Sequence, residues 1–199
     1  MALLILAILA FTAGTAMADS IGGRFGVTGR AGGLVPVGDP LISSTSESKT
    51  GFVGGGGLIF GLGSCFDADV EVLHSPQLNT EIGGVKVAEA QLTDIAIGIH
   101  YRIMPNNRLV PYIGGGADFI KGDVSFTSGN TYGLDWTYGG HANAGIDFFL
   151  NKSIALNLDF RGLFAVKGDI TRGDVVVGEY DPMSFIGTVG IRLILPEKL

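Results

Sequence analysis

Apolar and polar residues alternate with a period of two along several parts of the chain. In the clearest stretch, Ile154, Leu156, Leu158 and Phe160 alternate with small or polar residues. Similar alternation covers 66–72, 94–102 and 141–148, and weaker alternation covers 21–33, 51–62, 109–121 and 183–194. This spacing is typical of β-strands with one apolar and one polar face, and no helical periodicity extends over a useful length. The pattern predicts an all-β fold with eight strands.

The segments between these strands are of two kinds. Tight turns are predicted near 62–64, 104–108 and 150–153, and long polar connectors near 34–50, 75–87, 122–136 and 167–182. Because the two kinds alternate along the chain, all tight turns would lie at one end of the sheet. An even number of strands with this asymmetry predicts an eight-stranded antiparallel up-and-down transmembrane β-barrel of the bacterial outer membrane, with long external loops.

The first residues have a different character. An apolar run covers 2–11, and Ala16-Met17-Ala18 provides a site of the kind that signal peptidase cleaves. No Lys or Arg precedes this run, which departs from the usual signal peptide. We predict a cleaved signal peptide at 1–18 and a barrel domain at 19–199, rather than an uncleaved anchor, for which the run is short. Beyond Ala18, no apolar run is long enough for a transmembrane helix.

Alternation alone does not decide which face of the barrel is outside, because a soluble, ligand-binding lipocalin-like barrel also alternates. All six lysines fall in predicted loops, turns or strand ends: Lys49, Lys86, Lys121, Lys152, Lys167 and Lys198. The polar faces of the predicted strands instead carry arginines and carboxylates, which suit a paired charge network in a narrow lumen. The expected lumen residues are Arg24, Arg30, Asp67, Asp69, Glu71, Asp94, Arg102, Asp118, Asp147, Asp159, Arg161 and Arg192. Glycines on the same faces, at 55, 57, 114 and 116, would leave room for the arginine side chains.

Bulky aromatic residues gather near the strand ends, as in the two interfacial girdles of membrane barrels. The girdle at the tight-turn end is predicted to contain Phe25, Phe60, Phe66, Tyr101 and Phe148. The girdle at the loop end is predicted to contain Phe52, Phe119, Tyr138, Phe164 and Phe185. These rings favour the membrane barrel over the soluble one.

Composition excludes several classes of protein. With 13 basic and 19 acidic residues the net charge is −6, and no cluster of Lys and Arg suggests a nucleic-acid surface. The single Cys65 excludes an internal disulfide framework and a zinc site of several thiolates, and we interpret it as a structural thiol. The 33 glycines follow no Gly-X-Y period, which excludes collagen.

Few motifs suggest chemistry. The glycine run 54–57 lies in a strand pattern and lacks the Lys-Ser/Thr of a phosphate-binding loop. His74-Ser75 falls at the rim, where a lipid-modifying barrel enzyme of the lipid A deacylase kind would need a Ser-His-acid set. His100 and His141 are expected in the lumen beside Asp94 and Asp147, as hydrogen-bond partners rather than metal ligands. No cofactor or metal is predicted.

One stretch also resembles a known family. Val110-Pro111-Tyr112-Ile113-Gly114-Gly115-Gly116-Ala117-Asp118, then 145–153 and 156–161, resemble the small eight-stranded outer-membrane β-barrel proteins, most closely the OmpW-type family. The OmpW-type resemblance implies passage of small hydrophobic molecules that leave sideways into the bilayer. Two features depart from it: the lumen is rich in charges, and the chain ends without the aromatic residue that the insertion machinery reads.

These observations predict a non-enzymatic outer-membrane barrel that serves envelope integrity, surface contacts or the passage of small solutes. Its expected partners are outer-membrane lipid, lipopolysaccharide and the barrel-insertion machinery, and we expect a monomer that binds no nucleic acid. A lipid-modifying enzyme and a soluble periplasmic ligand-binding barrel are the alternatives.

Overall fold

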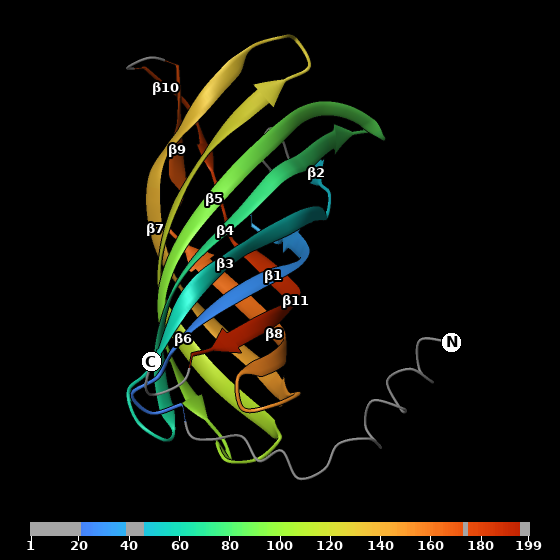
Figure 1. Ribbon diagram of the computed structural model, residues 1–199. Coiled ribbons are helices and arrows are strands. Elements are labelled where there is room, and N and C mark those ends of the chain that lie inside the picture. Colours follow the sequence, from blue (N-terminus) through green and yellow to red (C-terminus); the bar gives the residue numbers. More distant parts are fainter. Residues whose placement is uncertain (1–20, 39–45, 173–174, 196–199) are drawn as a thin grey trace, which may run out of the picture.

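The computed structural model describes residues 21–38, 46–172 and 175–195, and the predicted signal peptide lies outside these ranges. The described chain contains eleven strands (Figure 1). They are β1 (Phe25–Pro36), β2 (Ser46–Ser48), β3 (Gly51–Gly61), β4 (Phe66–Ile82), β5 (Val85–Arg102), β6 (Leu109–Phe126), β7 (Thr131–Phe149), β8 (Ile154–Ala165), β9 (Gly168–Arg172), β10 (Val175–Tyr180) and β11 (Ser184–Ile194). In these ranges, no helix is both long enough and apolar enough to cross a membrane.

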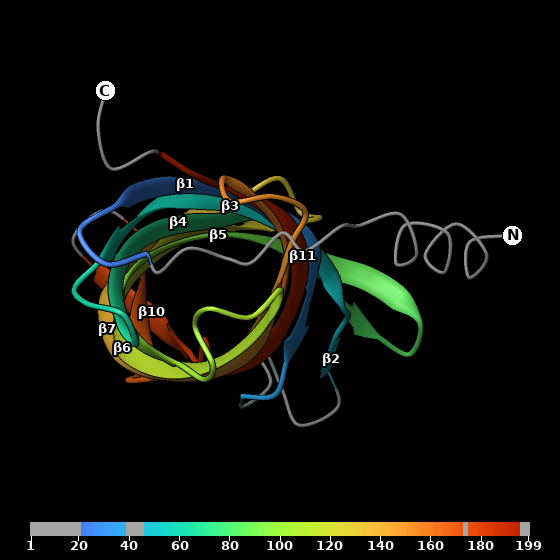
Figure 2. The same ribbon diagram turned by 60° about the horizontal axis from the view of Figure 1, so that its bottom comes forward.

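Eight of the strands close into a ring, which is seen end-on in Figure 2. Each pairs antiparallel with its neighbours in the order β1, β3, β4, β5, β6, β7, β8, β11 and back to β1. The predicted eight-stranded antiparallel barrel is therefore confirmed. The three remaining strands lie at the loop end, where β2 pairs with β4, β9 pairs with β7 and β10 pairs with β9.

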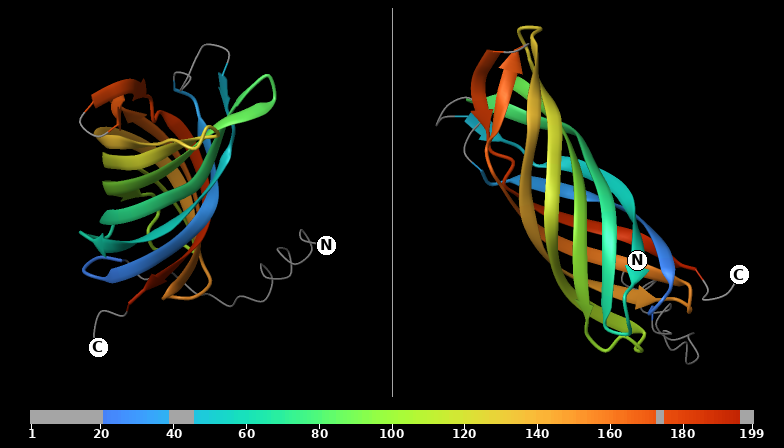
Figure 3. Two further views of the ribbon diagram at one scale, coloured as in Figure 1. Left: turned by 90° about the horizontal axis from the view of Figure 1, so that it is seen from above. Right: turned by 90° about the vertical axis from the view of Figure 1, so that its left-hand side faces the viewer.

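The tight turns lie where the sequence predicts them, but three of the long connectors are largely strand. The connector expected near 167–182 contains β9 and β10. The connectors expected near 75–87 and 122–136 are mostly strand, because β4 to β7 continue well beyond the other strands (Figure 3). The β4–β5 hairpin turns at Gly83 and Gly84, whose φ values of 58° and 81° suit residues without a side chain. The β6–β7 hairpin turns over 127–130.

The alternation of side chains inverts along these long strands, which explains the wrong prediction. In the middle of the ring, charged residues point inward and apolar residues point outward. Nearer the tips, Leu78, Ala90 and Val124 are buried, whereas Gln77 and Gln91 are exposed. Polar residues on the outer face of a water-exposed strand have the composition of a loop, so the sequence pattern indicates a loop where the structure has strands.

In the part of the barrel between the tight turns and the strand extensions, the apolar face is outside. Large apolar side chains such as Leu58, Ile99 and Phe160 are about 60% exposed, whereas the arginines and carboxylates in this part of the barrel are buried. A soluble barrel would need the opposite arrangement, so the lipocalin-like alternative is wrong.

The aromatic residues that were assigned to the girdles lie on or near the outer surface at the two levels. Phe25 packs against Phe60, with ring centroids 4.5 Å apart, and Phe66 packs against Tyr101 at 5.2 Å, both near the tight turns. At the other level, Phe119 of β6 is the register partner of Tyr138 of β7.

One lysine lies where the sequence did not place it. Lys121 was expected in a loop or at a strand end, but β6 continues for five residues beyond it to Phe126. β6 leaves the apolar band before Lys121, so an outward-facing charged side chain is tolerated at this position of the strand. Lys198 lies outside the described residues.

Candidate functional site: the charged lumen

The interior of the barrel has three layers. Near the tight turns, an apolar cluster closes the interior: Ile21, Ile59, Val110, Phe149, Ala155 and Ile194. The middle layer contains the buried charges. Toward the loops, a larger apolar cluster includes Leu34, Val53, Leu73, Leu92, Ile120, Leu163 and Ile186. The sequence pattern predicts the middle layer but neither of the apolar layers.

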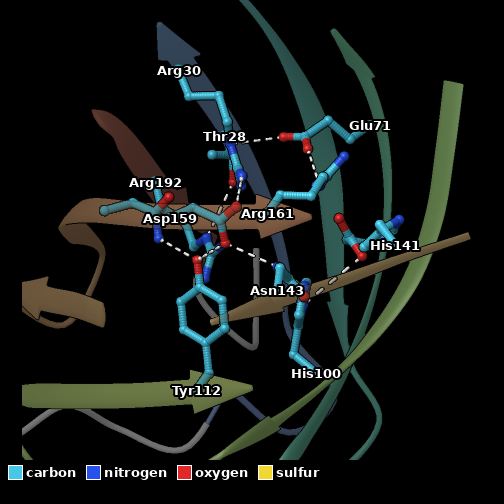
Figure 4. Close-up of polar contacts among 12 residues, drawn as sticks. Thr28, Arg30, Glu71, His100, Tyr112, His141, Asn143, Asp159, Arg161 and Arg192 are labelled. Atoms are coloured by element: carbon cyan, nitrogen blue, oxygen red, sulfur yellow. Dashed lines mark hydrogen bonds and ion pairs between the residues drawn. The ribbon is translucent and has the colours of Figure 1, made fainter. Parts of the chain in front are cut away.

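Glu71 of β4 is the centre of one half of the charged layer (Figure 4). Its Oε2 lies 2.6 Å from Nη2 of Arg161 on β8, and its Oε1 lies 2.7 Å from Nε of Arg30 on β1. Arg30 also lies 3.4 Å from Asp159, through Nη1 and Oδ1. One carboxylate therefore joins three walls of the barrel.

Asp147 of β7 is the centre of the other half. Its Oδ2 accepts hydrogen bonds from Nη1 of Arg192 at 2.5 Å and from Nη2 of Arg102 at 2.8 Å. Arg102 also donates to Oδ2 of Asp67 at 3.2 Å, and Arg192 donates through Nε to Oγ1 of Thr28 at 3.1 Å. Bonds of this charge-assisted kind offset the cost of burying the ions.

Neutral polar side chains connect the two halves. Tyr112 donates its hydroxyl hydrogen to Oδ2 of Asp159 at 2.7 Å, and Asn143 donates to the same oxygen at 2.9 Å. Asn157 donates to Oδ1 of Asp147 at 2.8 Å and to the hydroxyl oxygen of Tyr112 at 3.0 Å. Tyr112 was not predicted as a lumen residue, because an aromatic residue among the apolar residues of a barrel strand gives no sign of pointing inward.

Both predicted lumen histidines are buried, but their carboxylate partners are not those expected. Nδ1 of His100 lies 2.8 Å from Oδ1 of Asp67, and Nδ1 of His141 lies 2.9 Å from Asp118. Asp94 and Asp147 were the expected partners, but Asp94 lies six positions from His100 along β5, and Asp147 lies six positions from His141 along β7. Asp67 on β4 is the register partner of His100.

The glycines of β6 make room for these rings. A Cβ atom on Gly114 would lie 2.1 Å from Cδ2 of His100, and one on Gly116 would lie 2.8 Å from Cε1 of His141. These two glycines therefore lie against imidazole rings, rather than against the guanidinium groups expected from the sequence.

All twelve residues assigned to the lumen are buried, but Arg24 does not join the charged layer. Arg24 lies at the tight-turn end and donates to backbone carbonyls, including those of Leu195 at 2.9 Å and Lys152 at 3.1 Å. Asp94 lies at the edge of the charged layer, 3.7 Å from Arg161. Asp69 lies 3.8 Å from His100.

The candidate residues for catalysis or metal binding do not lie together in one site. His74 is exposed on the outer surface, where Nδ1 lies 3.0 Å from Oγ1 of Thr93. Ser75 points inward and donates to the carbonyl of Phe52 at 2.8 Å, so the two side chains are on opposite faces of the sheet. In the part of the chain that the structure describes, no three His, Cys, Asp or Glu side chains are grouped as metal ligands.

The interior leaves little room for a solute. One cavity of about 20 Å³ lies where the charged layer meets the apolar layer on the loop side, and it is lined by Asp94, Ser75, Ser184 and apolar side chains. Another cavity of about 20 Å³ lies nearer the loops, beside Leu78 and Tyr180. Each has room for about one water molecule.

Comparison with known proteins agrees with this architecture. A family model described as the outer membrane protein beta-barrel domain matches residues 3–192. The outer membrane protein OprG of Pseudomonas aeruginosa is 14% identical, with a TM-score of 0.65, over 89% of this chain and 99% of that one. AlkL, solved in lipid bilayers, is 18% identical, with a TM-score of 0.60, over 93% of this chain and 95% of that one. No curated protein matches the sequence.

Proposed function

Because the chain belongs to the outer membrane protein beta-barrel domain family, we propose that it is a non-enzymatic, closed barrel that supports envelope integrity and surface contacts. The filled lumen is the main support for this proposal. Four arginines, seven carboxylates and two histidines occupy the middle of the interior, and apolar clusters lie on both sides of them. Opening a water-filled path would separate buried ion pairs, at a cost of several kcal/mol each.

A role in surface contacts is supported by the extension of β4 to β7 beyond the loop-end girdle. The two hairpins and the added strands β2, β9 and β10 form a folded β-structure at the loop end, which faces outward in barrels of this asymmetry. The eight-stranded ring holds this structure in the membrane, and each strand of the ring pairs with two neighbouring strands.

Conductance across a planar bilayer tests the closed lumen. Purified protein is reconstituted beside an open porin as the positive control, and we expect no steady current above the leak of the protein-free membrane. Large, steady and weakly selective currents would contradict the proposal.

Passage of small hydrophobic molecules is the second candidate. It is supported by the apolar layer on the loop side, which would offer an apolar compartment above the charges. An apolar dye that enters protein-containing vesicles faster than empty ones, without ionic current, would favour this candidate over the closed anchor.

Export is part of the proposal. We infer that residues 1–18 are removed and that the mature chain begins at Asp19. The intact mass of the protein purified from outer membranes measures this directly, and a mass that includes the first 18 residues would refute cleavage. Insertion by the barrel-insertion machinery and a monomeric state stay predictions.

A further inference from the structure

The outer surface of β6 and β7 carries an exposed cation stacked on an indole ring. Nζ of Lys121 lies 5.6 Å from the centroid of the Trp136 ring. Trp136 is 56% exposed, and Lys121 is exposed as well. In the described part of the chain, Lys121 has no ion pair with a carboxylate, whereas Lys86 pairs with Glu89 and Lys49 with Glu81.

The position of Lys121 along the strand places it just outside the apolar band. Phe119 lies ten positions beyond Leu109, which corresponds to about 26 Å along the barrel axis at ~3.4 Å per residue and a tilt of ~40°. That height matches the apolar band of about 25 Å in barrels of this kind. Lys121 lies two positions further on, so its ammonium group is at the level of lipid headgroups.

The neighbouring strands carry polar groups beside it. Lys121 is the register partner of Thr93 on β5, and Thr93 is the partner of His74 on β4. Nδ1 of His74 lies 3.0 Å from Oγ1 of Thr93 on the exposed outer surface. On β3, β8 and β11 the corresponding level is occupied by the exposed rings of Phe52, Phe164 and Phe185. The girdle is therefore interrupted by polar side chains on one side only.

We propose that Lys121 and Trp136 bind a phosphate group of a phosphorylated glycolipid in the outer leaflet, that is, of lipopolysaccharide. The ammonium group of Lys121 and the indole N–H of Trp136 are both donors for phosphate oxygens, and His74 with Thr93 adds polar contacts for the sugar. The acyl chains of such a lipid would lie on the apolar surface below Phe119 and Tyr138.

The surrounding charge favours a lipid over an anion from solution. The chain carries a net charge of −6. The exposed carboxylate of Asp123 lies two positions beyond Lys121 on the loop side, and that of Asp135 lies opposite Lys121 at the bulge between β6 and β7. A free anion would approach past these carboxylates, which repel it. A phosphate held in the membrane reaches Lys121 from below.

Lipid retention measures this binding. The full mature barrel is reconstituted in phosphatidylcholine vesicles with lipid A, with dephosphorylated lipid A or with phosphatidylglycerol, and lipid bound after extraction is quantified by native mass spectrometry. We expect the wild type to retain lipid A in preference to the other two. Lys121→Ala should weaken retention on the order of tenfold, as for the loss of one charge-assisted hydrogen bond, and Lys121→Arg should retain it.

Lys86→Ala is the matched control, because it removes the same charge on the same side of the membrane but from a lysine that pairs with Glu89. Its retention of lipid A should equal that of the wild type. Equal retention by the Lys121→Ala and Lys86→Ala proteins would overturn the proposal, as would equal retention of lipid A with and without phosphate. Equal retention of phosphatidylglycerol would overturn the assignment to a glycolipid. The closed lumen is tested separately by conductance, so either proposal can fail alone.

Discussion

Arg161 and Glu71 join opposite walls of the barrel. Arg161 lies on β8 and Glu71 on β4, and three strands separate them in either direction around the ring. Nη2 and Oε2 are nevertheless 2.6 Å apart, and the two residues are 90 positions apart in the sequence. Because Arg30 of β1 contacts the same carboxylate, this group fixes the cross-section of the barrel at three points.

Removing Arg161 should destabilise the barrel strongly. Arg161→Ala leaves Glu71 with one cationic partner and moves Asp94 further from any positive charge, and we expect unfolding in detergent to become easier by about 3 kcal/mol. The double variant Arg161→Met/Glu71→Gln is the control, because it removes both charges and should recover part of the loss. An unchanged urea midpoint for Arg161→Ala would contradict the ion pair.

The inner glycines of β6 should tolerate no side chain. A methyl group on Gly114 would meet Cδ2 of His100 and Oδ1 of Asn143, so Gly114→Ala should cost about 1 to 3 kcal/mol through overpacking. Gly29→Ala on β1 is the control, since nothing lies within 4 Å of the added atom. Equal urea midpoints for the two variants would show that the lumen has room that the structure lacks.

The sequence predicted the ring of strands because the membrane imposes one rule on it. The outer face of strands such as 154–160 and 66–72 must be apolar, which produces the alternation seen in the sequence. The narrow lumen must pair its charges, which explains why arginines and carboxylates occupy the other face. The partners of the charges are not visible, because they depend on register and on contacts across the lumen. His100 pairs with Asp67 rather than Asp94 for that reason.

The strand extensions were missed for the opposite reason. Beyond the girdle the rule reverses, and Leu78 and Ala90 point inward while polar residues face water. A short alternation of this kind between Gly-rich turns has the composition of a loop. Only pairing with the next strand, such as Leu78 with Ala90, identifies it as sheet.

Alkaline pH should loosen the loop end of the barrel. Tyr180 of β10 packs against the upper apolar cluster, and burial raises the pKa of its hydroxyl, with a further contribution from Asp181. A group whose pKa is raised on folding stabilises the protein below its unfolded pKa, which is about 10 for Tyr, and loses that contribution as the pH rises further. We therefore expect hydrogen exchange in β9 and β10 to accelerate above about pH 10.

Tyr180→Phe is the control for this effect, because it keeps the ring and removes the ionisable group. Its exchange in β9 and β10 should show no added acceleration between pH 9 and about pH 11 relative to the barrel strands. The same acceleration in the variant would assign the effect to another group.

The orientation of β8 in the bilayer can be tested at two adjacent residues. Leu158 faces outward and is 39% exposed, whereas Asn157 is buried and donates to Asp147 and Tyr112. Leu158→Arg places a cation in hydrocarbon near the middle of the strand and should cost about 2 to 4 kcal/mol of folding free energy in a bilayer. The cost should shrink in a detergent micelle, where water reaches the outer surface more easily. Asn157→Arg should destabilise the barrel in both media, because the lumen lacks space for the side chain.

Spin labels at positions 158 and 144, where Ala144 also faces outward, should be relaxed by oxygen and shielded from a water-soluble nickel complex. The reverse accessibility at both positions would mean that the apolar face is the interior.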